Sequence, residues 1–164
     1  MAVVKLIANI SILMIAVLTL GCGGPGKNST NSPSGANQAS DSSNSAKTNV
    51  EELRLVATIP YESEDVAWKE NKANKKLIAV LRFSPTDSAK IVAEAERVKP
   101  SETASISAES WFPPELIAQS EMSGDAVLRG NAYAANQFFL DQYSAGRVIR
   151  IENTDYFVLE LSSK

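Results

Sequence analysis

The apolar positions of the chain fall into three different patterns. Residues 6–20 form a run of 15 residues without a charged side chain. Residues 23–48 contain nothing more apolar than alanine. Residues 49–164 mix apolar and polar positions at the spacings of strands and helices. The pattern predicts three segments, 1–21, 22–48 and 49–164, and only the last has the length and apolar content to fold around one core.

Several stretches of residues 49–164 alternate between apolar and polar side chains, which predicts β-strands. Residues 53–59 alternate and predict a strand that stops at Pro60. Residues 76–83 are apolar on both faces, which indicates a central strand covered on both sides. Residues 147–152 and 156–161 alternate around a polar turn and predict a hairpin. Weaker patterns at 66–68 and 126–133 predict two further strands, and we expect a polar loop at 100–109.

The main predicted helix begins after Ser84. Serine suits the N-cap, Pro85 the first helical position and Asp87 the first turn. Apolar side chains recur at helical spacing up to Val98, and Pro100 ends the helix. We therefore predict an α+β fold. It comprises a small antiparallel sheet of about four or five strands, with one main helix packed on a face, after a disordered N-terminal linker.

The composition of residues 22–48 predicts that linker. Residues 23–48 hold seven Ser, four Gly and four Asn, with no aromatic side chain. Such a segment buries too little apolar surface to offset the entropy of ordering, so we expect a flexible coil. Its mean reach is roughly 25–30 Å.

The first segment has the features of an export signal. Lys5 precedes the 15-residue apolar run, which as a helix is about 22 Å long and short of the roughly 30 Å hydrocarbon core of a bilayer. The residues Leu18-Thr19-Leu20-Gly21-Cys22 resemble a lipobox, the cleavage motif of bacterial lipoprotein precursors. Thr19 stands where leucine is usual. The resemblance implies that the Cys22 thiol receives a diacylglycerol and that cleavage occurs before Cys22.

This resemblance also implies a compartment. Acyl chains such as palmitate would anchor the exported protein to a bacterial membrane, with the folded segment presented in the cell envelope. Gly23 is not the aspartate linked with inner-membrane retention, so in a diderm cell we expect the outer membrane.

Composition removes several classes of function. The chain has no His and one Cys, which excludes His-dependent catalysis, an intramolecular disulfide and Cys-rich metal sites. Residues 49–164 hold 13 basic and 18 acidic side chains, a formal charge of −5 that argues against nucleic-acid binding. The acidic turn at Glu62, Glu64 and Asp65 lacks the spacing of a calcium loop, and a solvated surface explains it better. We expect no metal, no cofactor and no catalytic residue.

The most individual feature of the folded segment is Trp111-Phe112, followed by two prolines. One interpretation is an aromatic platform for an envelope protein or a glycan. The other is that Trp111 and Phe112 cap the core beside the main helix while the prolines set the turn, and this second interpretation is favoured. We retain Trp111 and Phe112 as the candidate partner-binding residues.

The sequence thus favours a membrane-tethered envelope lipoprotein whose domain binds or scaffolds without catalysis. The globular segment resembles those of uncharacterised bacterial lipoproteins only. The alternatives are an envelope hydrolase or lyase that uses carboxylates and an inhibitor or immunity-type module. The sequence does not determine the oligomeric state.

The anchor prediction is tested by Cys22→Ser. Without the thiol no thioether to lipid forms, so the variant should lose lipid labelling and leave the membrane fraction while the domain still folds. Fractionation with metabolic lipid labelling measures this. A variant that stays membrane-bound after signal cleavage contradicts a lipid anchor at Cys22.

Overall fold

The computed structural model describes residues 45–163 of the chain. Cys22, the predicted signal peptide and most of the predicted linker lie outside the described residues. Within residues 45–163, no helix combines the length and the apolar character needed to cross a bilayer.

The domain is built on one antiparallel sheet of six strands, in the order β1-β2-β6-β5-β4-β3. The prediction of four or five strands was therefore too low, whereas the α+β class is confirmed. The last two strands form the predicted hairpin. Residues 76–83, which are apolar on both faces, form a strand next to the centre of the sheet. The strand bounds are β1 Ser63–Asn71, β2 Lys76–Phe83, β3 Glu102–Ser107, β4 Val127–Ala134, β5 Ala145–Ile151 and β6 Tyr156–Ser162.

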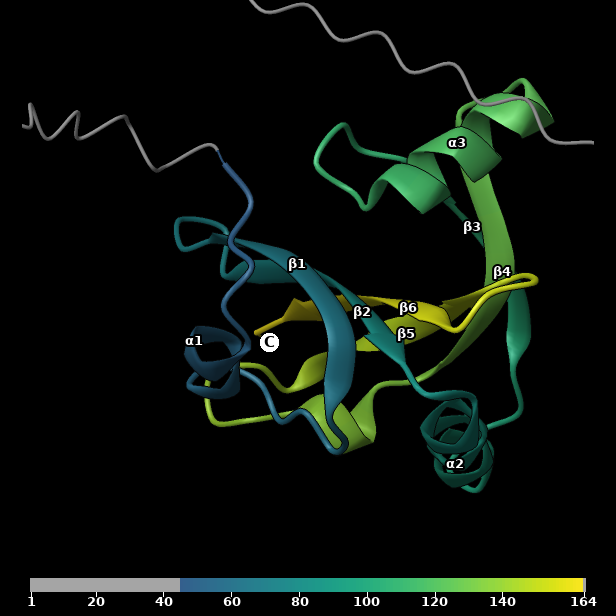
Figure 1. Cartoon of the computed structure of the whole chain (residues 1–164). Coiled ribbons are helices and arrows are strands. Elements are labelled where there is room, and N and C mark those ends of the chain that lie inside the picture. Colours follow the sequence, from purple (N-terminus) through teal and green to yellow (C-terminus); the bar gives the residue numbers. More distant parts are fainter. Residues whose placement is uncertain (1–44, 164) are drawn as a thin grey trace, which may run out of the picture. The chain divides into compact units, whose positions relative to one another are not determined.

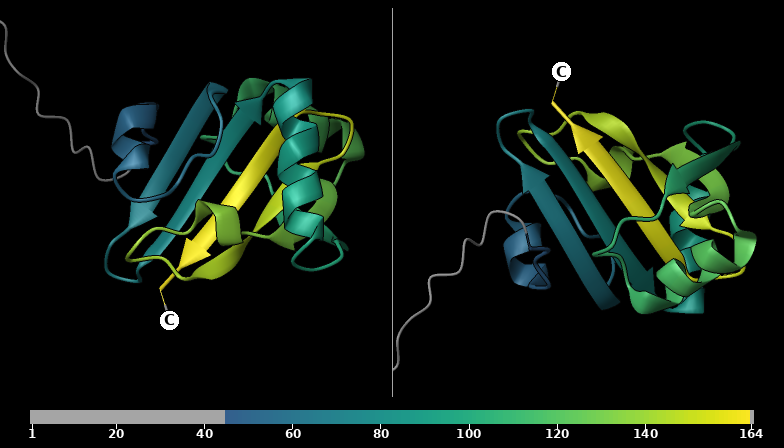
Figure 2. Two further views of the ribbon diagram at one scale, coloured as in Figure 1. Left: turned by 90° about the horizontal axis from the view of Figure 1, so that it is seen from below. Right: turned by 90° about the horizontal axis from the view of Figure 1, so that it is seen from above.

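Helices cover both faces of the sheet (Figure 1). The main helix α2, Pro85–Glu96, lies on one face together with α1, Val50–Arg54, and the 3-10 turn η1, Asn136–Phe138. The other face carries α3, Pro114–Ser123, which covers only part of it (Figure 2). One main helix on a face was expected, and α3 is a second helix on the opposite face. The second helix is needed because the central strands are apolar on both sides.

Two apolar layers result, one on each face. Ile91 of α2 and Phe138 of η1 are fully buried in the first layer, and Phe112 and Leu116 beside α3 are buried in the second. Alternate residues of each strand supply the rest of each layer. In the first layer these include Trp68, Leu77, Leu81, Phe83, Val148, Phe157 and Leu159, and in the second Val80, Leu128, Ile149, Ile151 and Val158.

The predicted strand at residues 53–59 is wrong, because its first residues form α1. The Asn49 side chain accepts hydrogen bonds from the backbone N–H groups of Glu51 (2.9 Å) and Glu52 (3.3 Å). This is an N-cap, and the acidic side chains in the first turn complement the helix dipole. Leu53 is buried while Leu55 is 78% exposed, which is inconsistent with a strand that buries both on one face.

The loop expected at residues 100–109 is also wrong, because it contains β3. Ala104 and Ile106 are partly buried against the α3 layer, while Thr103, Ser105 and Ser107 are exposed. The strand alternates, but its apolar side chains are few because β3 lies at the edge of the sheet.

The backbones of β4 and β5 approach each other closely at Gly130, and this approach gives a test of the pairing between the two strands. A Cβ atom at Gly130 would overlap the backbone carbonyl of Arg150 on the paired strand. We expect Gly130→Ala to lower the free energy of unfolding by about 2–3 kcal/mol, because the strands must move apart. Urea unfolding measures the change.

The matched control is Gly124→Ala. Gly124 ends α3 with a φ of 79° and has no neighbouring atom within 4 Å of a built Cβ. Its cost should be only that of a left-handed alanine, about 1 kcal/mol. Equal losses at the two glycines would contradict the close approach of β4 and β5.

Candidate functional site

A pocket of about 530 Å³ lies where four parts of the domain meet. It is formed by the start of β1, the end of β2 with the start of α2, the first turns of α3, and the turn between β5 and β6. We call it the Tyr156 pocket. Its lining residues are Glu64, Arg82, Phe83, Pro85, Glu115, Gln119, Thr154, Asp155 and Tyr156.

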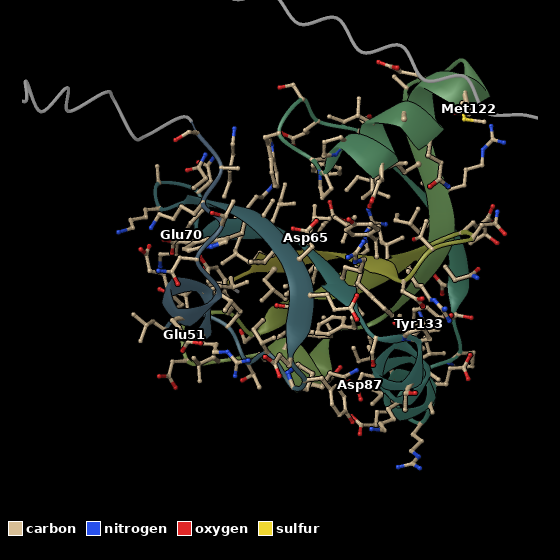
Figure 3. All side chains as sticks on the ribbon, viewed as in Figure 1. Glu51, Asp65, Glu70, Asp87, Met122 and Tyr133 are labelled. Carbon is tan, nitrogen blue, oxygen red and sulfur yellow. The ribbon has the colours of Figure 1, made fainter. Side chains whose placement is uncertain are left out.

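The hydroxyl of Tyr156 is the centre of the polar contacts in this pocket. It lies 2.9 Å from Asp65 Oδ2 and 2.6 Å from Glu115 Oε2, and the residue is 4% exposed. Asp65 projects from β1 on the side of the sheet that α3 occupies (Figure 3). The hydroxyl has one proton and donates it to one carboxylate at a time, so Asp65 and Glu115 from separate elements share a single donor.

Cross-strand pairing explains how these side chains meet. Asp65 on β1 pairs with Arg82 on β2, and Arg82 pairs with Tyr156 on β6. Directly paired residues share a face, so the three side chains form a row across the sheet. Glu115 reaches this row from the first turn of α3, since Leu116 beside it is buried in the second apolar layer.

Arg82 is the one basic side chain in the middle of the pocket. Its guanidinium carbon lies 5.6 Å from the centre of the Tyr156 ring. Arg82 Nη1 lies 3.6 Å from Glu115 Oε2, and Arg82 Nε lies 3.3 Å from Glu64 Oε2. The second contact is an ion pair without hydrogen-bond geometry, so the buried Nε–H group has no acceptor within the described residues.

Carboxylates outnumber basic groups at this site. Glu64, Asp65, Glu115 and Asp155 converge on it, against Arg82 and Arg150. Arg150 is already bound to Asp155, with Nη2 at 3.0 Å from Oδ1. The pocket therefore has two negative charges in excess, which favours a cationic group as ligand. In the part of the chain that the structure describes, no cluster of three or more acidic side chains is arranged to hold a metal ion.

The predicted partner-binding pair lies near α3 but outside the Tyr156 pocket. Phe112 is 3% exposed and packs in the second apolar layer, so it offers almost no surface to a partner. Trp111 is partly buried, and its ring lies edge-on to Phe112 with centroids 4.7 Å apart. Lys69 Nζ of β1 lies 5.4 Å from the Trp111 ring. A partner-binding role for Trp111 remains a prediction.

Sequence reasoning missed most of the pocket. Glu64 and Asp65 belong to the acidic turn that we interpreted as a solvated surface, and Arg82, Glu115 and Tyr156 carried no motif. The missing information was the strand order: β6 lies beside β2, and no local pattern encodes that neighbour.

A second cavity, also of about 530 Å³, lies at the opposite end of β1. Tyr143 donates a hydrogen bond of 2.9 Å to Glu70 Oε1 there. Lys72 and Lys75 line it together with Glu70, so it lacks the excess of carboxylates found in the Tyr156 pocket.

No protein-family model matches the chain, and the comparisons with curated proteins and with solved structures give no match either. The functional proposals therefore rest on the residues themselves.

The two buried phenols predict an alkaline loss of stability. Burial first, and then hydrogen bonding to carboxylates, raises the pKa of Tyr156 and of Tyr143 above the ordinary value of 10.0. The unfolded chain releases these protons near pH 10 while the folded chain keeps them. The stabilisation is therefore complete below pH 10 and is lost as the pH rises above it.

The test compares urea unfolding between about pH 9 and 11 for the native chain and for Tyr156→Phe and Tyr143→Phe. We expect each variant to show a smaller fall in the free energy of unfolding over this range. Tyr133→Phe is the control, since the tyrosine–carboxylate hydrogen bonds among the described residues come from the other three tyrosines. An unchanged slope in both variants would show that these phenols ionise normally.

Proposed function

We propose that this chain is a bacterial envelope lipoprotein, anchored through Cys22, whose domain binds a basic segment of another envelope protein without catalysing a reaction. The anchor part of the proposal is supported by the sequence at residues 18–22 and the apolar run before it. The binding part is supported by the excess of carboxylates in the Tyr156 pocket.

The chemistry of the pocket suits a lysine or arginine side chain. Glu64 and Glu115 have side chains that are 48% and 65% exposed, so their oxygens are accessible to an incoming donor. Arg82 forms ion pairs with Glu64 and Glu115 but donates no hydrogen bond to either. An ammonium or guanidinium group of a ligand would donate charge-assisted hydrogen bonds to these carboxylates. The domain's formal charge of −5 would steer a basic partner towards it.

A basic protein segment fits the pocket better than a glycan does. Sugar rings are commonly held against an open aromatic face, but the aromatic side chains of this pocket, Phe83 and Tyr156, are 0% and 4% exposed. The pocket thus offers charge and hydrogen bonds without a stacking surface.

A carboxylate-using hydrolase is the second candidate, favoured by the convergence of Asp65 and Glu115 on one hydroxyl. Glu115 is largely exposed, so the pair is not shielded from water as a tuned acid–base pair commonly is. Tyr156 keeps its proton at neutral pH and is not a base there. We therefore place binding before catalysis.

The binding proposal is tested with a capped trilysine peptide and the full chain. Calorimetry or chemical-shift titration should show binding that weakens as salt rises and that fails for the same peptide with acetylated lysines. Glu115→Gln should weaken the affinity about 5-fold, as expected for the loss of one exposed charge.

The matched control is Glu121→Gln, which changes an exposed acid on the same helix α3 outside the pocket. Its affinity should stay close to that of the native chain. Equal effects of the two substitutions, or equal binding of the acetylated peptide, would contradict a cation site in the Tyr156 pocket.

A further inference from the structure

The two edges of the sheet differ in what covers them. The outer edge of β1 carries the chain's own residue Lys47, which exchanges two backbone hydrogen bonds of 2.8 Å with Trp68. Within residues 45–163, β3 has a hydrogen-bonded partner on one side only, namely β4. The outer backbone groups of β3 are therefore available to another strand.

The sequence of β3 lacks the features that usually block an edge. Its six residues pair with β4 without a register shift, so no bulge bends the strand away. The strand contains no proline and no lysine, and Glu102 at its start is the only charged residue. Edges of this kind accept an added strand, whereas protected edges carry prolines, lysines or bulges.

Any strand added here must match the alternation of β3. Ala104 and Ile106 face the α3 layer, and Thr103, Ser105 and Ser107 are exposed on the opposite side. An antiparallel copy of β3 meets this requirement, because residues of the same parity then face each other.

We propose that β3 pairs with β3 of a second copy of this chain, antiparallel and with a two-fold axis at Ser105. Ala104 of one copy then faces Ile106 of the other, and Thr103 faces Ser107. Five of the six strand residues pair within β3, with apolar pairs on one face and hydroxyl pairs on the other. Two six-stranded sheets become one continuous sheet.

The match of side chains and the number of paired residues favour this register over its neighbours. In it, Glu102 faces Ala108 of the second copy, and no two charges of the same sign are directly opposed. A two-fold axis at Ala104 would place Glu102 opposite Ile106. An axis at Ile106 would leave only three residues of each β3 facing another β3 residue.

The size of the interface indicates where it forms. A six-residue strand is about 20 Å long and buries less than the roughly 1,000 Å² that stable interfaces need, so the pair is weak in free solution. Confinement to a membrane surface raises the effective concentration of two copies. This step rests on the proposed anchor at Cys22, whereas the pairing itself does not.

The described part of the N-terminal segment lies at the other edge of the sheet. Lys47 is bound beside β1, which lies five strand spacings, about 24 Å, from β3. The two edges lie on opposite borders of the sheet in the views of Figure 2. The β1 edge thus serves the chain's own segment and the β3 edge a second copy.

The test is cysteine cross-linking of the full chain in membranes. With the axis at Ser105, the two Ser105→Cys positions face each other at a Cα distance of about 5 Å, which permits a disulfide. The two Thr103→Cys positions are offset by about 14 Å, which does not. We expect mild oxidation to cross-link most of the Ser105→Cys chains and to leave Thr103→Cys at the background of the native chain.

Membranes that contain two different variants extend the test, because Thr103 of one copy faces Ser107 of the other in the proposed pairing. Thr103→Cys and Ser107→Cys chains expressed together should form the heterodimer, and neither should cross-link alone. Ser105→Lys places like charges directly opposite each other and should abolish the proximity of tagged copies. Exposed Ser105 tolerates both substitutions, as circular dichroism would verify.

A parallel arm separates this proposal from the anchor. The double variant Cys22→Ser and Ser105→Cys, purified and concentrated in solution, should still cross-link with the same position dependence, at a lower fraction. If the chains cross-link in solution but the cross-linked fraction is no higher in membranes, the result contradicts the proposed anchor and leaves the pairing of β3 supported. Three outcomes would overturn the pairing of β3 with itself. They are equal cross-linking of Ser105→Cys and Thr103→Cys, no cross-link in either arm, and a cross-link to a different protein.

Discussion

The domain depends on covering both faces of β2 and β6, two neighbouring interior strands of the sheet. Both are buried along most of their length, so each presents apolar side chains to two layers at once. One layer is closed by α2, α1 and η1, and the other by α3 and the Phe112 loop. The positions of the helices, and therefore of the pocket between α3 and the sheet, follow from this demand.

The sequence predicted the elements whose signal is local. Residues 76–83 are apolar at consecutive positions, the hairpin after Arg147 alternates, and Ser84 begins a capped helix. Each of these patterns needs no knowledge of a neighbour. It failed at Leu53, where an asparagine cap outweighed an alternating pattern, and at β3, where an edge strand needs few apolar residues. The pocket lay beyond prediction because Asp65, Arg82 and Tyr156 meet only through the strand order.

The polar row across the sheet lies at the margin of the second apolar layer. There, Leu116 of α3 packs in the apolar layer, and the carboxylate of the neighbouring Glu115 contacts the Tyr156 hydroxyl at its margin. A buried hydroxyl that donates to a carboxylate contributes about 1.5–3 kcal/mol, and it disfavours arrangements that leave it unpaired. The row therefore fixes how α3 sits on the sheet. A site built on such a row is preorganised, because its side chains are held by strands and not by loops.

The place of β6 determines the order in which the domain assembles. It is the last strand in chain order, yet it lies between β2 and β5. The β1–β2 hairpin and the β4–β5 pair form from nearby residues, but among the described residues these two halves of the sheet are joined by strand pairing only through β6. The two apolar layers are therefore complete only when β6 lies between β2 and β5.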